Sequence, residues 1–364
     1  MLFRSYALEH GTEALSMCVR KAVNEMLGSL AEDAGIRRED VFQVCVVGNT
    51  CMHHLFLGIS PASLVHAPYT PAVSERLVLN AGDYGLAVQE RAELIMLSDI
   101  AGYVGADTCG CLLAIRQDQQ EEISLMIDIG TNGEMVLGNR ERMVTCSTAA
   151  GPAFEGAKIE CGMRGAAGAV DHVKYEDGKW NYTTVGNKPA VGLCGSGLID
   201  LVAGLLDAGM LDENGVLRSG QEKQGVFILV LPERGGNERG VYLTQKDLGE
   251  VQLAKAAIAA GIQMLMERLG ITEDDICSVY IAGAFGNYMD PVSAGKIGLL
   301  PATLVKKVKP VGNAAGEGAK IALVNEKEML EMDELVRKIE FVELAASADF
   351  QDHFIDELGF ETGE

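Results

Sequence analysis

The segment from Ile127 to Glu134 carries the strongest chemical signal in this sequence. It reads Ile-Asp-Ile-Gly-Thr-Asn-Gly-Glu, so Asp128 ends an apolar stretch and a Gly/Thr/Asn turn follows at once. The amides of such a turn and the Thr131 hydroxyl can donate hydrogen bonds to a phosphate, and the carboxylate can hold a Mg²⁺-bound water. A plain hairpin whose turn needs Gly and Asn would have the same residues. The segment therefore predicts a hairpin, either phosphate-binding or purely structural.

Two further glycine-rich segments follow apolar stretches. Tyr280 to Asn287 contains Gly283 and Gly286, which would let the backbone approach a flat ligand such as a purine riboside. Val191 to Gly197 ends in Gly-Ser-Gly and opens a helix whose N-terminus could bind an anion. Each segment also fits a tight strand-to-helix turn without any ligand, and for each taken alone that structural interpretation is favoured.

Several single residues could also carry chemistry. Glu155 follows the hairpin region on a loop and could be a general base that orients water, although a solvated glutamate is the commoner case. Lys255 could border a nucleotide or face water. His53 and His54 are adjacent, so on a helix they point about 100° apart and cannot easily share a metal ion. We expect one of them at the surface and the other partly packed.

Alternating strands and helices position these segments. Thr244 with Asp247 predicts a capping box for a long helix, and Gly270 its C-terminal stop. Strands alternating with helices predict an α/β fold with ligands at the C-terminal ends of strands. The apolar spacing predicts helices at 13–30, 51–57, 102–116 and 244–269, helices opened by Asp290 and Asn313, and strands at 41–47, 94–97, 124–129, 134–137, 142–147, 277–282 and 308–311.

Composition narrows the function classes. The net charge of −22 and the aromatic content of 5% argue against nucleic-acid binding, and no apolar run is long enough to cross a membrane. The nine cysteines are scattered, which is typical of reduced thiols in the cytosol. Cys109 and Cys111 are the closest two, and one pair cannot supply the four ligands of an iron–sulfur cluster. We therefore expect no such cluster on this chain.

In combination, these segments resemble the acetate/sugar kinase, heat-shock chaperone and actin superfamily, whose members close two RNase H-like lobes on ATP. More narrowly, the sequence resembles the ATPase domain of the reductive activators of corrinoid proteins. Long stretches match in the same order across most of the chain, namely residues 47–55, 100–107, 127–134, 147–157, 195–200, 245–247 and 282–288.

The resemblance implies a role for each site residue. Asp128 would hold Mg²⁺ through water, the turn after it would cradle phosphate, and Glu155 would orient the attacking water. Gly283 to Asn287 would be the adenosine motif. The catalytic candidates are thus Asp128 and Glu155, and the cofactor-binding candidates are Gly130, Thr131, Asn132, Gly133, Gly151, Lys255, Gly283, Ala284, Gly286 and Asn287.

The resemblance also implies an α/β fold of the RNase H-like, actin and sugar-kinase type. Residues 1–118 would be the first lobe, and 119–364 the second lobe with a glycine-rich insertion at about 156–243. Segments 102–107 and 312–318 would connect the lobes. Family members carry an earlier D-x-G-T hairpin that has no counterpart before the helix at residue 13. We therefore expect an incomplete first lobe in a chain that starts partway through it.

The implied function is that of a cytoplasmic, ATP-binding and ATP-hydrolysing component of anaerobic metabolism. It would use Mg²⁺ to drive reductive reactivation of the Co(II) corrinoid protein of a cobalamin-dependent methyltransferase system. An external ferredoxin-type protein would donate the electron. An exposed sheet edge in an incomplete lobe would favour a homodimer. Two alternatives remain open: a small-molecule kinase of the same superfamily, and a non-catalytic module that binds a nucleotide or a partner.

Overall fold

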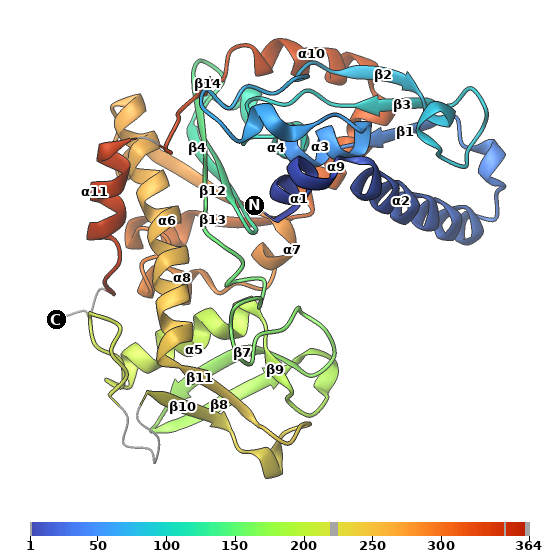
Figure 1. Ribbon diagram of the computed structural model, residues 1–364. Coiled ribbons are helices and arrows are strands. Elements are labelled where there is room, and N and C mark those ends of the chain that lie inside the picture. The colour runs from blue at the N-terminus through green and yellow to red at the C-terminus, as the bar shows by residue number, and fades with distance from the viewer. Residues whose placement is uncertain (1, 219–224, 346, 361–364) are drawn as a thin grey trace. The chain divides into compact units, whose positions relative to one another are not determined.

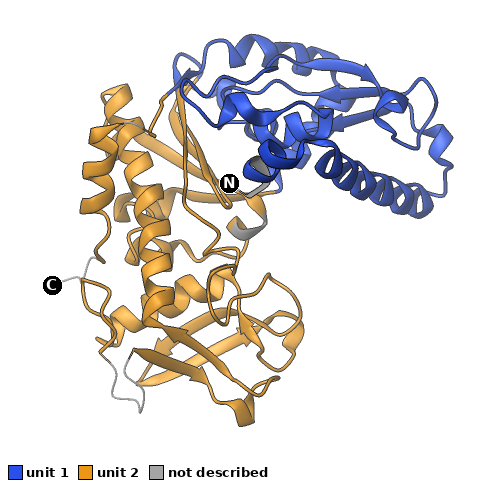
Figure 2. Ribbon diagram, in the orientation of Figure 1, with its two compact units in different colours: residues 1–120, 140–143, 313–341 blue, residues 121–139, 144–312, 342–364 orange. Residues whose placement is uncertain are grey.

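The structure, a computed structural model, describes residues 2–218, 225–345 and 347–360. Its contacts divide the chain into two compact units, which Figure 2 colours separately. Unit 1 comprises residues 1–120, 140–143 and 313–341, and unit 2 comprises 121–139, 144–312 and 342–364. Residues 313–341 therefore return to the first unit late in the chain. In the ranges described, no helix has the length and apolar character needed to span a bilayer.

Unit 1 contains a small mixed sheet with the strand order β1-β3-β2 (Figure 1). β1 (Gln43–Val46) and β3 (Glu93–Met96) are parallel, whereas β2 (Leu77–Asn80) is antiparallel to β3. Leu94 and Phe56 belong to the buried apolar cluster beside this sheet. The sequence did not predict β2, because four residues with half-exposed alternation give a weak periodic signal.

Besides this sheet, unit 1 contains α-helices and short 3-10 helices. Asn49 accepts a hydrogen bond from the backbone of Met52 and so caps α3. The predicted helix at 13–30 continues for one more turn and ends at Gly35. The helices are α1 (Leu2–His10), α2 (Glu13–Ala34), η1 (Arg38–Asp40), α3 (Thr50–Leu57), η2 (Pro61–Leu64), η3 (Ala81–Tyr84), α4 (Ala106–Ile115), η4 (Gln117–Gln119), α9 (Ala314–Val324) and α10 (Glu326–Val336), and β14 is Glu340–Phe341.

Two of these helices, α4 and α9, pack through a pair of glycines. A Cβ atom on Gly318 would lie 1.9 Å from the carbonyl oxygen of Gly110, and one on Gly110 would lie 2.6 Å from the carbonyl oxygen of Ala315. No side chain fits at either position. The two helices match the segments that the family resemblance assigned to lobe connection, and in the structure both belong to unit 1.

Unit 2 contains a larger sheet whose central order is β13-β12-β4-β5-β6. β4 is parallel to β12 and antiparallel to β5, so β4 and β5 form the predicted hairpin. Helix α6 packs against β5, where Gly261 leaves room for the Met135 side chain. The strands are β4 (Ile123–Ile129), β5 (Gly133–Gly138), β6 (Met143–Thr148), β12 (Ile276–Ala282) and β13 (Val308–Gly312).

The segment between β6 and α6 forms the glycine-rich insertion. β7 lies between β8 and β9 in one small sheet, and β10 pairs with β11 in another. α5 packs on β7, and 11 of its 13 residues are buried. These elements are β7 (Ala169–Glu176), β8 (Lys179–Thr184), η5 (Val185–Asn187), β9 (Gly192–Leu193), α5 (Gly195–Asp207), β10 (Val226–Val230), η6 (Pro232–Arg234) and β11 (Val241–Thr244).

Two of the remaining helices of unit 2, α6 and α8, begin at the caps predicted for them. Thr244 and Asp247 form the predicted capping box of α6, and Gly270 ends the helix in a left-handed conformation. Asp290 caps α8 by accepting from the Ser293 backbone. These helices are α6 (Gln245–Leu269), η7 (Glu273–Asp275), α7 (Gly283–Gly286), α8 (Pro291–Lys296), η8 (Ala302–Lys307) and α11 (Ala348–Asp356).

Candidate functional site

Asp128 lies at the end of β4, between two other strands. The sheet register pairs it with Glu134 of β5 on one side and with Ala282 of β12 on the other. Directly paired residues project from the same face of a sheet, so the Asp128 and Glu134 side chains start from neighbouring positions. Oε1 of Glu134 accepts from the Ser147 hydroxyl at 3.4 Å. Glu134 is only 8% exposed. This end of the hairpin therefore concentrates negative charge, which favours a bound cation or a shared proton.

The turn after β4 is joined to the loop that follows β6. Inside the turn, the Gly130 amide donates to the Asn132 carbonyl at 2.9 Å. The Gly151 amide donates to the Thr131 carbonyl at 2.8 Å, and the Thr131 hydroxyl donates to Oε1 of Glu155 at 2.6 Å. Glu155 is exposed, as expected for a loop glutamate, yet it is fixed beside the hairpin.

The turn after β12 reaches the same carboxylate. Gly283 has a φ of +88°, which favours glycine, and a Cβ atom there would lie 2.8 Å from Oδ1 of Asp128. A Cβ atom on Gly286 would instead lie 2.7 Å from Cγ2 of Ile281, so packing within the chain explains that glycine. Asn287 is exposed at the end of this turn. The backbone of Ala284 lies in α7, and its side chain lies outside the described residues.

Two predicted cofactor-binding residues have other neighbours in the structure. A Cβ atom on Gly133 would lie 2.9 Å from the Thr148 hydroxyl, so this buried glycine is required for packing. Lys255 is 1% exposed, and its ammonium donates to the Gly359 carbonyl and lies 5.6 Å from the centroid of the Phe360 ring. The alternative of a solvent-facing Lys255 is therefore wrong. A nucleotide contact for either residue stays a prediction.

The expectation for the adjacent histidines is also wrong, because both are buried. His53 is 5% exposed and His54 1%. Nε2 of His54 accepts from the Ala72 amide at 3.0 Å, so its Nδ1 carries the proton and donates to the Thr50 carbonyl at 2.7 Å. Nδ1 of His53 lies 3.1 Å from Oδ2 of Asp99. Helix α3 packs against α2 and η2, which its short sequence did not reveal.

Asp99 joins His53 to the start of the next helix. Its Oδ1 accepts from the Ala106 amide at 2.9 Å, at the N-terminus of α4. Burial raises the pKa of Asp99, although the bond to His53 acts in the opposite direction. Nε2 of His53 is buried and has no hydrogen-bond partner among the described residues. The arrangement fixes α3 against α4 inside unit 1.

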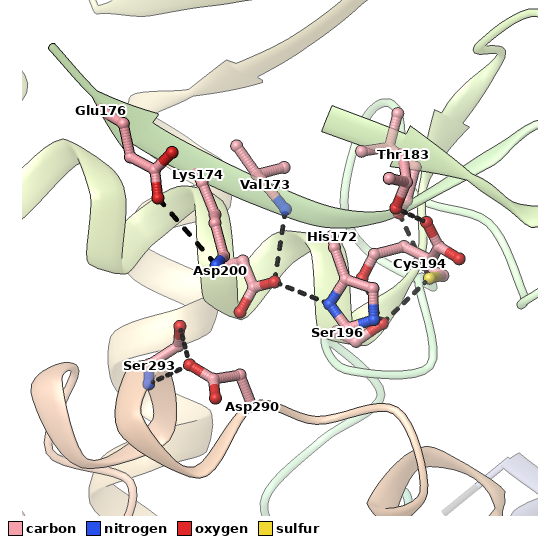
Figure 3. Close-up of polar contacts among 12 residues, drawn as sticks. His172, Val173, Lys174, Glu176, Thr183, Cys194, Ser196, Asp200, Asp290 and Ser293 are labelled. Atoms are coloured by element: carbon pink, nitrogen blue, oxygen red, sulfur yellow. Dashed lines mark hydrogen bonds and ion pairs between the residues drawn. The ribbon is translucent and has the colours of Figure 1, made fainter. Parts of the chain in front are cut away.

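A second His–Asp pair lies in the insertion (Figure 3). Oδ2 of Asp200, on α5, lies 3.1 Å from Nδ1 of His172 and 3.3 Å from the Val173 amide, both on β7. Burial raises the pKa of Asp200, and hydrogen bonding from Ser293 and His172 opposes that effect. His172 itself is exposed. The buried carboxylate therefore orients a surface imidazole.

The Gly-Ser-Gly segment at the start of α5 is explained by packing. A Cβ atom on Gly197 would lie 2.2 Å from the Val170 carbonyl oxygen, and the Ser196 hydroxyl donates to the Asp171 carbonyl at 2.8 Å. The structural interpretation of this segment accounts for both residues. An anion at this helix N-terminus is not needed to explain the sequence.

Cysteines do not form a metal centre in the described part of the chain. All nine are free thiols, and Cys109 and Cys111 are buried in α4. Burial raises the pKa of Cys45 to about 11 and that of Cys109 well above its usual value, so both stay protonated. Among the residues described, no three His, Cys, Asp or Glu side chains are grouped so that they could hold a metal ion.

The structure adds Glu134 to the candidate site. The sequence analysis quoted this residue as the end of the hairpin motif but assigned it no role. Its position follows from the register, because a turn that pairs Ile129 with Gly133 places residue 134 opposite Asp128. Counting outward from a correct turn would therefore have found it.

Comparisons with known proteins agree along almost the whole chain. Residues 122–364 match the family described as the C-terminal domain of RACo, the ASKHA domain, and residues 4–120 match the RACo middle region. A solved structure described as a reductive activator for corrinoid, iron–sulfur protein superposes with a TM-score of 0.90 and 37% identity. It covers 98% of this chain and 59% of its own, and the actin-like ASKHA fold predicted from the sequence is thereby confirmed.

Two curated relatives give the same picture. The corrinoid activation enzyme RamQ of Eubacterium limosum is 34% identical over 352 residues, which are 93% of this chain and 59% of that protein. The [Co(II) methylated amine-specific corrinoid protein] reductase of Methanosarcina barkeri is 29% identical over 303 residues, 77% of this chain and 54% of that protein. The chain thus spans less than three-fifths of the length of either curated relative.

Proposed function

The chain belongs to the RACo family, and from that membership we propose that it is the ATP-dependent component of a reductive corrinoid activator. In this role it binds ATP with Mg²⁺ at the β4–β5 hairpin and promotes reduction of an inactive Co(II) corrinoid protein. The electron comes from a ferredoxin-type centre outside the residues described here. Relatives named for corrinoid activation and for corrinoid-protein reduction support this assignment.

One observation carries the nucleotide site: three loops meet at the end of the β4–β5 hairpin. They are the turn after β4, the loop after β6 and the turn after β12, and all belong to unit 2. Ligands of α/β folds bind at the C-terminal ends of strands, which is where these loops lie. The fit to a nucleotide is supported by Gly151, whose φ is +78° and whose Cβ position faces open space. A phosphate can approach the backbone there without a side chain in its way.

The paired carboxylates suit Mg²⁺ chemistry. Mg²⁺ prefers oxygen ligands, keeps several waters, and is commonly bound through one or two carboxylates together with substrate phosphates. Asp128 and Glu134 offer such oxygens at the end of the hairpin. When bound, the ion would supply positive charge that offsets the charge of the phosphates. In its absence the two side chains would repel one another across the ladder.

Thr131 and Glu155 provide an exchange of hydrogen bonds. The Thr131 hydroxyl has a single proton, which it donates to Glu155 in this structure. If that hydroxyl turns to donate to a phosphate oxygen, Glu155 loses this hydrogen-bond donor and accepts a hydrogen bond from water instead. A carboxylate that accepts from water can orient the water and take its proton, as a general base does. Thr131 thereby couples phosphate binding to the freeing of Glu155.

Nucleotide chemistry can drive electron transfer only through differential binding. A ligand shifts a conformational equilibrium by no more than the difference in its affinity for the two states. The corrinoid partner must therefore bind the ATP-loaded and ATP-free forms of this protein with different affinities. By reciprocity, the partner must change the affinity for ATP by the same factor.

The nucleotide site is tested by calorimetry of ATP–Mg²⁺ binding to the wild type and to Asp128→Ala. We expect binding by the wild type and an affinity at least about tenfold lower in the variant. Asp352→Ala is the matched control, because it removes one exposed carboxylate from α11, and it should bind as the wild type does. Equal binding by all three proteins would contradict the assignment of Asp128.

The coupled activity is tested separately. Reduction of a Co(II) corrinoid protein by a reduced ferredoxin is monitored through the absorbance of the corrinoid, with and without ATP. ATP-dependent reduction that is lost in Asp128→Ala is expected. ATP binding without hydrolysis or reduction would favour the non-catalytic module, and transfer of phosphate to a small acceptor would favour the kinase.

A further inference from the structure

Unit 1 contains a cavity that the proposed nucleotide site does not explain. It has a volume of about 710 Å³, within the usual range for small-molecule sites. Its walls are one side of α2, the start of η1 and the turn around η3. Three of its lining side chains are cationic, although the chain as a whole has a net charge of −22, and they are Arg20, Lys21 and Arg38.

Arg20 is held rigidly in this wall. Its Nε donates to the Phe56 carbonyl at 2.8 Å, and its guanidinium carbon lies 5.1 Å from the centroid of the Tyr84 ring. Its terminal amino groups have no carboxylate partner among the described residues. A stacked guanidinium whose fork is left unpaired is a bidentate donor ready for a carboxylate or phosphate.

Arg38 reaches the same cavity across a glycine of α2. A Cβ atom on Gly28 would lie 2.0 Å from an Nη atom of Arg38 and 2.9 Å from its guanidinium carbon. The missing side chain at Gly28 therefore makes the space in which Arg38 lies. A glycine inside a helix costs about 1 kcal/mol relative to alanine, so this one requires a reason. In the described part of the chain, no carboxylate pairs with Arg38.

The opposite wall is tied to α2, so the cavity keeps its shape. Nδ2 of Asn24 donates to the Gly85 carbonyl at 2.8 Å, and its Oδ1 accepts from the Ala87 amide at 2.7 Å. These two bonds hold the turn that carries Tyr84 against the helix. A binding site whose walls are already held in place loses less conformational entropy when a ligand binds.

Of the cationic side chains that line the cavity, only Lys21 has a carboxylate partner in the described residues, so the guanidiniums of Arg20 and Arg38 can bind a ligand. Glu25 lies 3.9 Å from Lys21 and offsets it. Asp83 is the other lining carboxylate. Apart from the Lys21–Glu25 pair, the lining has two arginines and one aromatic ring but only one carboxylate, that of Asp83. This set of side chains suits an anion with more than one acidic group.

We propose that this cavity, lined by Arg20, Arg38 and Tyr84, is a binding site for a small polyanion that carries two or more carboxylate or phosphate groups. The site lies wholly within unit 1 and uses none of the hairpin residues. It would give the protein a second small ligand in addition to the nucleotide.

Citrate and inorganic pyrophosphate are the probes, titrated by calorimetry into the full chain at low ionic strength with EDTA present. Binding of citrate alone identifies a carboxylate ligand, binding of pyrophosphate alone identifies a phosphate ligand, and binding of both identifies the shared chemistry. Arg38→Gln should weaken binding about tenfold, because a charge-assisted pair is lost. Asp352→Ala, which removes one exposed carboxylate from α11, should bind the probes as the wild type does.

Gly28→Ala is the sharpest variant, because it displaces Arg38 without removing any charge. Its affinity should fall about threefold or more, while helix stability rises. Gly249→Ala is the matched control: it is the same substitution inside α6, at a position with no atom within 4 Å of the new Cβ, and it should leave binding unchanged. No binding of either probe, or equal binding in the wild type, Arg38→Gln and Gly28→Ala, would overturn the proposal.

Discussion

Gly105, in the turn before α4 of unit 1, differs from Gly130 and Gly151, at and beside the hairpin of unit 2, in what fills the space next to it. A Cβ atom on Gly105 would lie 2.5 Å from the Gly48 carbonyl oxygen and 2.5 Å from Cα of Asn49, so backbone occupies that space. A Cβ atom on Gly151 would meet nothing within 4 Å, and one on Gly130 would have its nearest neighbour at 3.6 Å. Glycine permits close packing in the first case and access in the second.

The polar side chains near these glycines also differ between the two units. In unit 1, the carboxylate of Asp99 is buried and bonded to His53 and to the Ala106 amide. In unit 2, Thr131 and Glu155 are exposed, and their side chains bond to one another across two loops. Groups that can exchange partners are therefore left at the hairpin, whereas the turn of unit 1 holds its groups in fixed pairs. That contrast, more than the glycine count, separates the proposed nucleotide site of unit 2 from the structural turn of unit 1.

The largest effect that tests this contrast is expected for Gly105→Ala. The new methyl group would meet main-chain atoms that cannot rotate away, so the free energy of unfolding should fall by about 3 kcal/mol. Urea denaturation followed by circular dichroism measures it. Gly249→Ala has open space and should be neutral or slightly stabilising. A loss below 1 kcal/mol at Gly105 would mean that the turn of unit 1 can open as the hairpin does.

Gly151→Ala should have an intermediate effect on stability and a selective effect on binding. Its φ of +78° is unfavourable for alanine, which should cost about 1 kcal/mol, without any steric clash. The methyl group would enter the open space beside the hairpin and lower the affinity for ATP–Mg²⁺. Denaturation and calorimetry on the same preparation measure both. Unchanged affinity would place the phosphates away from Gly151 and would weaken the idea that this glycine provides access.

Sequence reasoning located the hairpin, the long helix and their caps, because these depend on local signals. The Thr244–Asp247 capping box depends on two residues three positions apart, and the strand that contains Asp128 depends on one short apolar stretch. It failed for His53 and His54, since burial of α3 depends on Asp99 and Ala72, which lie far along the chain. The alternative of a solvent-facing Lys255 was wrong for the same reason, because the carbonyl that Lys255 contacts lies 104 residues away. The nucleotide site itself stays a prediction.

The return of residues 313–341 to unit 1 was also beyond local signals. α9 carries an ordinary cap at Asn313, and nothing in its own sequence names its neighbour. The match becomes visible only when Gly318 is set against Gly110, two glycines separated by two hundred residues. Close helix contacts of this kind need small residues on both helices, so a search for glycine pairs on predicted helices would have suggested the partner.

The smallest expected effect is a difference in pH dependence at Asp99. Burial raises the pKa of this carboxyl above its unfolded value, so between those two values the folded state binds more protons than the unfolded state. The free energy of unfolding then decreases as pH rises through that window. Asp99→Asn removes the contribution, so its stability relative to the wild type should rise with pH across the window and be constant above it. Denaturation at a series of pH values from 4 upward measures the difference, with Asp352→Asn as an exposed control that should give no slope. A slope of opposite sign would mean that Asp99 is ionised beside a protonated His53, and the turn of unit 1 would then contain a charge pair able to titrate, as a reactive site does.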